Sequence, residues 1–478
     1  MGAPSLVGLL VVMVVVIALH AGEVEGGGKG VECGKGVKGG GCKGGGSEIK
    51  WRDPTRRRPK WETSGGAAGA GVPLDMGEAR NDGVRSDEAD ERAESRRDER
   101  APLVCFVRGE QFHRSGMKPF DVKSLPLEKC THIVYSFLET DNTTGELMFR
   151  KRDGKDEKDI LKELSNLKHH SKGKHLKVLF SYGAGAHTQS LMKQIHDEGK
   201  LQRMVDHIAW WLEKLDLDGV NFHLEGPGPP VCKRKEIITI LKFIKTLRRK
   251  IENRKLIAAQ LPACRRDHKC FLFMSEHMSR HLDYLFLMTF DYRLDDLSTT
   301  KITSGLYFYT DNKGPTTIES ETCLGKWIDS GVRKYKIIPG LAVHGRSFTL
   351  ANPAYNGVSA KLNKNHPLGN AASFTKTDGY MNYVETCQRA NQMHWKREWA
   401  PYAATAYIYS RDQWVSYDDK GSAEVKVKWF RDHSLGGVFV WSLEDDDYEG
   451  ICKKGERYPM LEVCWNFMKD YRPFQVTV

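Results

Sequence analysis

Short apolar runs alternate with amphipathic helical patterns along the chain from Leu103 onward. The helical segments repeat apolar side chains three and four residues apart, as in the stripes Ile160, Leu161, Leu164, Leu167 and Met204, Val205, Ile208, Leu212. We predict eight strands from the apolar runs: Leu103–Val107, His132–Phe137, Leu176–Tyr182, Gly219–Leu224, Leu256–Leu261, Tyr284–Thr289, Ile337–Ala342 and Gly437–Trp441. Eight strands that alternate with helices predict an α/β fold, a parallel (β/α)8 TIM barrel.

The gap between the last two predicted strands is too long for one helix. We therefore expect residues 347–416 to form a small α+β subdomain inserted after the seventh strand, inside a barrel domain over 102–475. A chain of 478 residues is long enough for a barrel of about 250 residues together with such an insertion.

The N-terminus has the pattern of an export signal. Leu6–Leu19 is almost continuously apolar, and Ala18, Ala21 and Gly22 supply small residues for cleavage. We predict a signal peptide over residues 1–22, a secreted and extracellular protein, and no membrane span after signal cleavage. An uncleaved membrane anchor is the alternative. If the protein is secreted, Asn142-Thr143-Thr144 is an acceptor for N-glycosylation.

Residues 23–101 are rich in glycine and charge and offer little to bury, which predicts a low-complexity disordered linker. A partner-binding tail is the alternative. In an oxidising compartment the eleven cysteines of the chain are expected to form disulfides. Their spacing suggests two pairs, Cys264 with Cys270 and Cys452 with Cys464.

The formal net charge of +11 belongs to the part of the chain after residue 101, because Glu23–Arg100 carries 16 basic and 16 acidic side chains. A basic surface can attract nucleic acid, anionic glycans or membranes. No nucleic-acid-binding motif accompanies the charge, so we expect a solvated surface and no nucleic-acid partner. The basic run Lys245, Arg248, Arg249, Lys250, Arg254, Lys255 is interpreted as a solvated helix face, with a heparin-type site as the alternative.

The fourth predicted strand carries the candidate chemistry, in the run Asp218-Gly219-Val220-Asn221-Phe222-His223-Leu224-Glu225. Side chains alternate along a strand, so Asn221, His223 and Glu225 share one face, and the apolar side chains take the other. In a TIM barrel the active site lies at the C-terminal ends of the strands. Glu225 is therefore a candidate general acid, and a carboxylate in a structural hydrogen-bond network is the alternative.

This run resembles the DGxDxDxE signature of glycoside hydrolase family 18, the chitinase and chitinase-like proteins. Further similarities follow in the family's order over about residues 102–470. Val104-Cys105-Phe106 and Cys130-Thr131-His132-Ile133 resemble its first two strands, and Met288-Thr289-Phe290-Asp291-Tyr292 its sixth-strand MxYD motif. Gly345-Arg346-Ser347-Phe348 and the segment from Gly436-Gly437 through Trp441 to Asp445-Asp446-Asp447 resemble the ends of strands seven and eight.

The resemblance implies a β-1,4-linked N-acetylglucosamine polymer as substrate. We expect no cofactor and no metal site, because the His and Cys residues lack ligand spacing. In the family the motif Glu protonates the leaving oxygen, and the substrate's acetamido group is the nucleophile, an exception to the two-carboxylate scheme. By position Glu225 matches this acid, and Asp291 matches the sixth-strand aspartate. Trp441, Met288, Phe290, Arg346 and Asp218 are the implied substrate-binding positions. The resemblance also implies a disulfide between Cys105 and Cys130.

The chain departs from the family pattern where the chemistry is done. The two motif aspartates before the Glu are Asn221 and His223, and the sixth-strand tyrosine is Phe290. His344 replaces the tyrosine before Gly345-Arg346, and tryptophans of the pattern are missing in the third-strand segment Ser181–Gly185 and at Glu110 and Asp296. Losing one aligned electrostatic partner commonly costs 10²–10³ in rate, roughly 3–4 kcal/mol.

These departures leave three hypotheses open. The first is a non-catalytic chitinase-like protein that binds chitin or chito-oligosaccharide glycans, or acts as a lectin or growth-factor-like signal through a cell-surface protein receptor. The second is an active or altered chitinase that depends on Glu225. The third is a protein-interaction scaffold that binds no glycan.

Overall fold

The computed structural model describes residues 100–473 except 113–119, 142, 153, 184–185, 226–233, 265–267, 308–309, 312–313 and 316–317. All described residues belong to the second of two compact units, Gly77–Val478. The predicted signal peptide, nearly all of the predicted linker and the glycosylation site Asn142 lie outside the described residues. None of the helices in the described part is long and apolar enough to cross a membrane.

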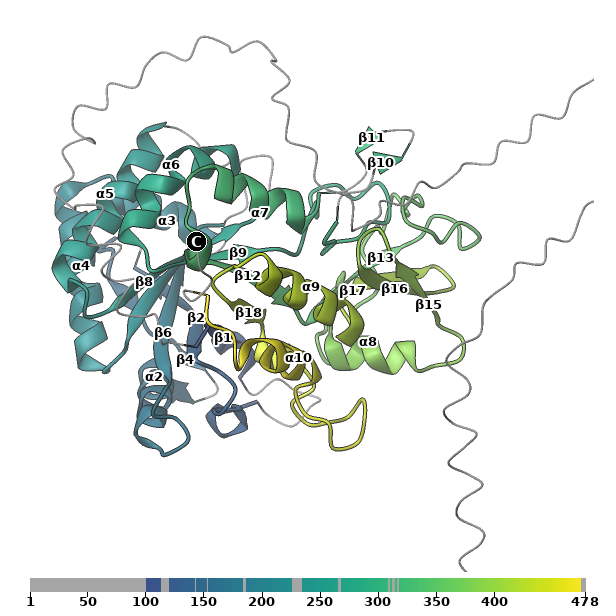
Figure 1. The fold of residues 1–478 in the computed structure, drawn as a ribbon, viewed down its shortest axis with the longest axis horizontal. Helices are drawn as coiled ribbons and strands as arrows, with labels where there is room; N and C mark the ends of the chain where they lie inside the picture. Colours follow the sequence, from purple (N-terminus) through teal and green to yellow (C-terminus); the bar gives the residue numbers. More distant parts are fainter. Residues whose placement is uncertain are drawn as a thin grey trace, which may run out of the picture. The chain divides into compact units, whose positions relative to one another are not determined.

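Eight parallel strands close into a barrel, which confirms the predicted fold class (Figure 1). In spatial order they are β1 (Leu103–Arg108), β2 (His132–Thr140), β6 (Lys177–Gly183), β7 (Gly219–His223), β8 (Leu256–Pro262), β9 (Tyr284–Met288), β12 (Ile337–Ala342) and β18 (Val438–Trp441). The barrel closes because β1 pairs in parallel with both β2 and β18. Each strand begins at the predicted start or one residue after it.

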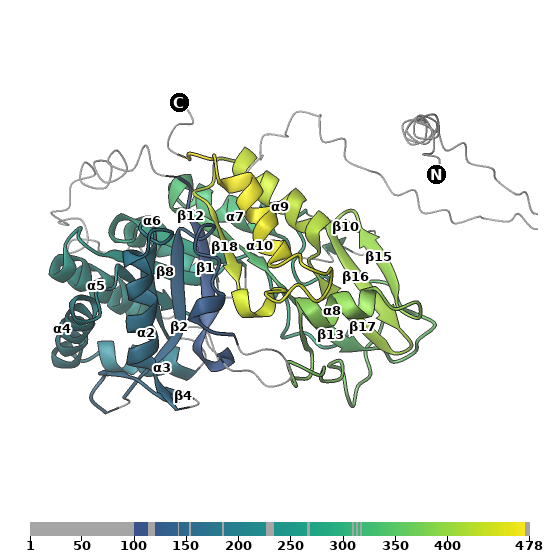
Figure 2. The same ribbon diagram turned by 90° about the horizontal axis from the view of Figure 1, so that it is seen from below.

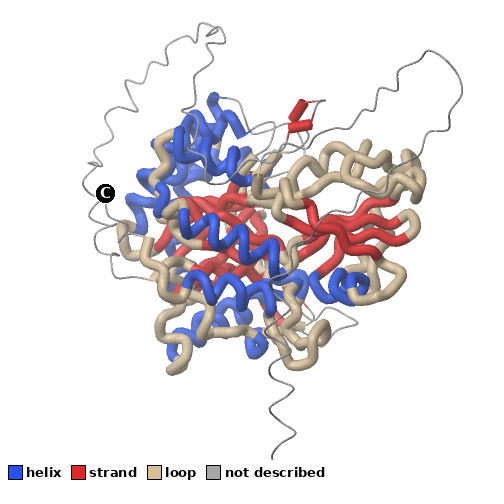
Figure 3. Tube along the Cα trace, turned by 45° about the vertical axis from the view of Figure 1, so that its right-hand side comes forward, coloured by secondary structure: helices blue, strands red, loops and turns tan. Residues whose placement is uncertain are grey.

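Helices cover the outside of the barrel (Figures 1 and 3). They are α2 (Glu157–Asn166), α3 (Ala186–Ile195), α4 (Glu198–Lys214), α5 (Arg234–Ile251), α6 (His268–His281), α7 (Ser320–Asp329), α9 (Lys420–Asp432) and α10 (Pro459–Met468). The helix α4 shows why they form. Asp197 accepts a hydrogen bond from the Lys200 amide and caps the N-terminus, and the stripe from Met204 to Leu212 is buried.

The alternation along each strand divides the apolar side chains into two cores. Val104 and Phe106 point into the barrel, where they join Phe286, Phe439 and other interior side chains. Leu103, Cys105 and Val107 point outward and belong to the larger core between barrel and helices. A filled interior leaves the strand ends as the place where polar chemistry can gather.

The insertion after the seventh barrel strand is built on a five-stranded antiparallel sheet (Figures 2 and 3). Its spatial order is β14 (Tyr380–Asn382), β13 (His344–Thr349), β17 (Gln413–Tyr417), β16 (Thr405–Ser410) and β15 (Lys396–Ala400), and α8 (Tyr383–Ala390) follows β14 directly. Asn382 starts α8 with a capping box shared with Glu385. Only Val343 separates the end of β12 from the start of β13. The sheet therefore starts at the mouth of the barrel.

Short elements complete the described chain. They are the strands β3 (Leu147–Met148), β4 (Lys151–Arg152), β5 (Lys155–Asp156), β10 (Thr310–Asp311) and β11 (Gly314–Pro315), and the 3-10 helices η1 (Gly109–Gln111), η2 (Val122–Ser124), η3 (Leu167–His169), η4 (Lys334–Lys336) and η5 (Leu443–Asp445). Of these, η1 directly follows β1, and η5 follows β18 after Ser442, so both lie at the C-terminal ends of barrel strands.

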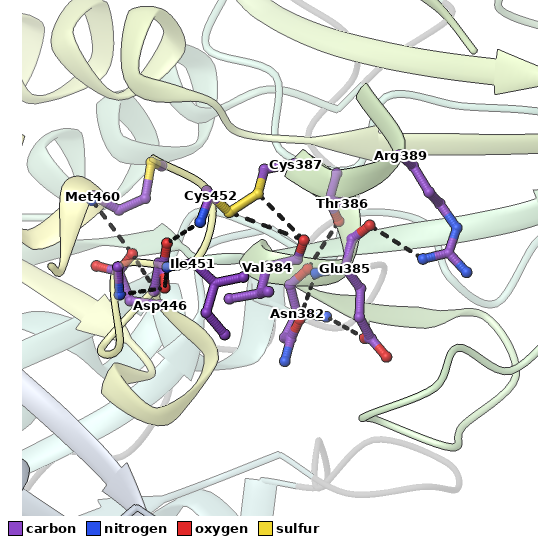
Figure 4. The surroundings of a disulfide bond; sticks show 12 residues. Asn382, Val384, Glu385, Thr386, Cys387, Arg389, Asp446, Ile451, Cys452 and Met460 are labelled. Atoms are coloured by element: carbon purple, nitrogen blue, oxygen red, sulfur yellow. Dashed lines mark hydrogen bonds between the residues drawn. A yellow bond between two sulfur atoms is a disulfide. The ribbon is translucent and has the colours of Figure 1, made fainter. Parts of the chain in front are cut away.

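Three disulfides join described cysteines. Cys105 is bonded to Cys130, and this pair fastens β1 to the start of β2. The two pairs expected from spacing are wrong, because Cys264 is bonded to Cys323 and Cys452 to Cys387. Figure 4 shows the last pair, which joins α8 of the insertion to the loop after β18. Cys464 is free and buried in α10.

Candidate functional site

The strand β7 ends in the polar face expected from the sequence. Asn221 and His223 are buried in the barrel interior, and Glu225 follows the strand at its C-terminal end with 33% of its side chain exposed. Thr188 of α3 holds this end, because its hydroxyl lies 2.9 Å from the carbonyl oxygen of Glu225 and 3.2 Å from that of His223. Sequence reasoning missed Thr188, whose position on an amphipathic helix gave no signal.

His223 lies beside the candidate acid. Its Nε2 is 3.5 Å from Oε2 of Glu225. Its ring packs edge-on against Phe137, with ring centres 4.9 Å apart, and lies 6.1 Å from the Trp441 ring. Nδ1 of His223 is buried and has no hydrogen-bond partner among the described residues. The imidazole is thus held mainly by aromatic packing, with one nitrogen directed to the carboxylate.

Asn221 belongs to a polar layer inside the barrel. Its Nδ2 donates to Oγ of Ser181 at 2.7 Å and to Oε1 of Gln260 at 3.3 Å. In the part of the chain that the structure describes, its Oδ1 has no partner. These bonds engage the amide with the neighbouring strands β6 and β8 rather than with Glu225.

Asp291, Arg346 and His344 form a second polar group, at the ends of β9 and β12. Nε of Arg346 donates to Oδ1 of Asp291 at 2.7 Å, a second guanidinium nitrogen contacts Oδ2, and Nε2 of His344 lies 3.0 Å from Oδ1. Burial by itself would raise the pKa of Asp291, but the charges of Arg346 and His344 hold it well below its ordinary value. Asp291 is therefore an ionised anchor and not a proton donor.

Apolar and aromatic side chains fill the space between these groups. Met288 and Phe290 are buried in the barrel interior, and the ring of Phe290 meets that of His344 edge-on at 5.7 Å. Trp441 ends β18 and is partly exposed, in contact with Phe106 at 5.1 Å and Phe137 at 5.8 Å between ring centres. Trp441 therefore offers an aromatic surface at the mouth of the barrel.

Asp218 is not part of this site, which corrects its assignment to substrate binding. It precedes β7 and so lies at the N-terminal end of the barrel, opposite to Glu225. Its Oδ2 accepts from the Val178 amide at 2.7 Å and lies 3.2 Å from Nζ of Lys168. The carboxylate fastens the starts of β6 and β7, a structural role.

A charged network that sequence reasoning missed lies at the ends of β1 and β18. Nε of Arg108 donates to Oε1 of Glu444 at 2.6 Å, and its NH2 group donates to Oδ2 of Asp445 at 2.5 Å. The hydroxyl of Tyr380, on β14 of the insertion, donates to the same oxygen of Asp445 at 2.5 Å. Burial raises the pKa of Glu444, and Arg108 opposes this shift. The one sequence signal for this network was the position of Arg108 at the end of β1.

The remaining acids of the eighth-strand motif hold the backbone. Asp447 accepts hydrogen bonds from the amides of Gly450, Ile451 and Cys452 at 2.7–2.8 Å. At the N-terminus of α10, Asp446 accepts from the Leu461 amide at 3.0 Å and from the Met460 amide at 3.4 Å, and Figure 4 shows Asp446 beside Met460. Both carboxylates are fully buried, so they stabilise the loop after β18 and take no direct part in the site.

The basic run at the end of α5 and in the turn after it is largely engaged in ion pairs and hydrogen bonds. Arg248 is buried and binds Oδ2 of Asp283 at 2.5 Å together with three carbonyl oxygens. Lys250 pairs with Asp206 at 2.6 Å, and Arg254 with Glu252 at 3.3 Å. Because these cations already have partners, the face fits the interpretation as a solvated surface better than the alternative of a heparin-type site. Across the described ranges no group of His, Cys, Asp and Glu has an arrangement that could hold a metal ion.

Comparison with known proteins identifies the family. The chain is 24% identical over 390 residues to an endochitinase of Manduca sexta, covering 78% of this chain and 68% of the relative. It superimposes on the group IV chitinase of Ostrinia furnacalis in complex with allosamidin, with a TM-score of 0.71, 23% identity and coverage of 77% and 99%. It also superimposes on human YKL-39, a pseudo-chitinase with retained chitooligosaccharide binding properties, with a TM-score of 0.68, 23% identity and coverage of 77% and 100%. The model of the glycosyl hydrolases family 18 matches residues 102–446, and the chain belongs to this family.

Proposed function

We propose that this protein is a secreted, non-catalytic member of its family that binds chito-oligosaccharides without hydrolysing them. The observation that carries the proposal is the pair of His223 and Glu225, with Nε2 of the imidazole 3.5 Å from Oε2 of the carboxylate. A histidine thus occupies the position where the family motif has an aspartate.

Catalysis in this family needs negative charge next to the acid. Cationic charge develops on the sugar when its acetamido group attacks, and an aspartate two residues before the acid stabilises it. His223 cannot supply an anion, because an imidazole is either neutral or positively charged, and a positive charge at this position would repel the developing charge. Asn221 is likewise uncharged, and its amide is bonded to Ser181 and Gln260.

The second loss is a hydroxyl. Phe290 is buried and offers only carbon atoms at the position where the family motif has a tyrosine that holds the acetamido group. Each missing partner costs about 10²–10³ in rate, although losses within one network are not additive. Together they support a protein with no useful turnover.

Several groups suited to binding remain. Trp441 is partly exposed and offers an aromatic surface for a sugar ring, and the side chains of Asp291 and Arg346 are about a quarter exposed. Carboxylate and guanidinium groups bond well to the hydroxyl and amide groups of sugars. YKL-39 combines loss of the chitinase function with retained chitooligosaccharide binding, and this supports the same combination here.

Secretion is part of the proposal. Three disulfides among the described cysteines are typical of an oxidising compartment, and the apolar segment Leu6–Leu19 has the composition of a signal-peptide core. A cell-surface protein receptor is a further partner that we propose for the secreted protein.

An altered chitinase is the second candidate, because the carboxylate of Glu225 is retained with a third of its side chain exposed. Two measurements on the secreted protein separate the candidates. The first is hydrolysis of a fluorogenic chito-oligosaccharide from pH 4 to 9, with Glu225→Gln as control. The second is calorimetric titration with chitotetraose.

We expect no hydrolysis above the Glu225→Gln control, together with saturable binding. Hydrolysis that disappears in the control would establish the altered chitinase. Neither hydrolysis nor binding would leave the protein-interaction scaffold.

A further inference from the structure

Two segments that are distant in sequence are fastened to each other at both ends. The hydroxyl of Tyr380 donates to Oδ2 of Asp445 at 2.5 Å, and Cys387 is disulfide-bonded to Cys452. Both links span 65 residues and join the insertion to the chain that follows the last barrel strand. The disulfide end is drawn in Figure 4. Tyr380 is therefore the point where the insertion is bonded to the barrel mouth.

The ring of Tyr380 contacts the polar group around Asp291. It stacks on the imidazole of His344, with ring centres 4.8 Å apart and planes at 20°. The guanidinium of Arg346 lies 4.8 Å from the ring centre, and that of Arg108 lies 5.7 Å from it. The ring of Tyr380 thus contacts both His344 and Arg346, the two partners that hold the Asp291 carboxylate.

The resulting network has a buried end and an accessible end. Asp445 and Glu444 are 0% and 1% exposed, and Arg108 holds both. Asp291 and Arg346 are 25% and 24% exposed. A ligand at the barrel mouth would meet the accessible end, while the buried end is fixed by the fold.

Asp291 needs such support, because its backbone has a φ of +58°, a left-handed conformation that non-glycine residues adopt rarely. His344 and Arg346 hold its carboxylate through contacts to Oδ1 of 3.0 Å and 2.7 Å. A preorganised polar pair binds a ligand more tightly, since less freedom is lost on binding.

We propose that Tyr380 is a positioning residue of the candidate site. Its hydroxyl, held by Asp445, keeps its ring against His344 and Arg346, and this contact fixes the carboxylate of Asp291 for the hydroxyl and amide groups of a bound sugar. The inference rests on the proposed glycan binding for its effect on affinity, and on the geometry alone for its effect on His344.

The test is Tyr380→Phe in the full chain, which keeps the ring and removes the hydroxyl. Tyr407→Phe is the matched control, since this tyrosine lies in the same sheet on β16 and stacks on Trp414. Chitotetraose binding is measured by calorimetry. The Hε1 signal of His344, assigned with His344→Gln, is measured by NMR with labelled histidine, because a stacked ring shifts this signal strongly.

We expect Tyr380→Phe to weaken binding about five-fold and to move the His344 signal, with both quantities unchanged in Tyr407→Phe. An unchanged His344 signal would overturn the proposal, even with weaker binding, because the effect would then not pass through this contact. If the unaltered protein binds no chitotetraose, the proposed function fails, and the His344 signal alone decides on the positioning role. If Tyr380→Phe does not fold, Asp445→Asn is judged by the same signal.

Discussion

Nε2 of His223 lies 3.5 Å from Oε2 of Glu225, and the imidazole packs against the rings of Phe137 and Trp441. The candidate acid thus has an imidazole for a neighbour where the family motif provides a carboxylate.

Restoring the family groups is expected to restore hydrolysis. In the triple variant Asn221→Asp, His223→Asp, Phe290→Tyr, the two carboxylates of the motif return before Glu225, and the hydroxyl returns at position 290. Each group commonly contributes about 10²–10³ in rate, so we expect measurable release of fluorophore from a chito-oligosaccharide substrate. Adding Glu225→Gln to the triple variant should abolish it. A triple variant that folds and remains inactive would show that His223 and Phe290 are not what prevents catalysis.

Trp441→Ala is expected to weaken chito-oligosaccharide binding. The indole is the partly exposed aromatic surface at the strand ends, and losing its contact with a sugar ring costs on the order of 2 kcal/mol, about 30-fold in Kd. Trp399→Ala is the matched control, because that tryptophan is 42% exposed on β15 of the insertion. Equal affinities of both variants in calorimetry would mean that the glycan binds elsewhere.

Asp291 is expected to stabilise the fold at pH values above the ordinary pKa of a carboxyl group. Its pKa is lowered in the folded state by Arg346 and His344, against the effect of burial. Its contribution is therefore complete above 3.8, its ordinary value, and is lost as the pH falls below that value. Asp291→Asn should cost about 1–3 kcal/mol at pH 7, discounted for its partial exposure, and the difference should shrink at pH 3. Urea unfolding at both pH values measures it, and a pH-independent difference would contradict the prediction.

Asp446 is expected to give the stability the opposite pH dependence from Asp291. Burial raises its pKa to about 7 from an ordinary 3.8, so the folded state binds a proton that the unfolded state has released. The stability from the protonated carboxyl is complete below 3.8 and is lost as the pH rises through 7, by about 1.4 kcal/mol for each unit of pKa difference. Asp446→Asn mimics the protonated form and should flatten the decline in unfolding free energy between pH 5 and 8. A decline as steep as that of the unaltered protein would show that another group is responsible.

The sequence by itself determined the barrel and the location of its chemistry. Strand alternation and helical stripes are local patterns, so the eight strands start where they were predicted, within one residue. The same alternation placed His223 inside the barrel and Glu225 at the C-terminal end of β7, because the side chains of a strand change face at every residue. The missing motif aspartates and the missing tyrosine are also visible in the sequence alone.

Only the tertiary structure decided which residues are bonded to each other across distant segments. Spacing suggested Cys264–Cys270, but the fold brings Cys323 of α7 to Cys264, which lies in the loop after β8 and is 59 residues away in the sequence. Asp218 stands in the same motif as Glu225, yet it lies at the opposite end of the strand, where it binds the Val178 amide. The bond from Tyr380 to Asp445 arises because the insertion folds back onto the barrel mouth. Contacts of this kind depend on how separate elements pack, and no local pattern of residues specifies that packing.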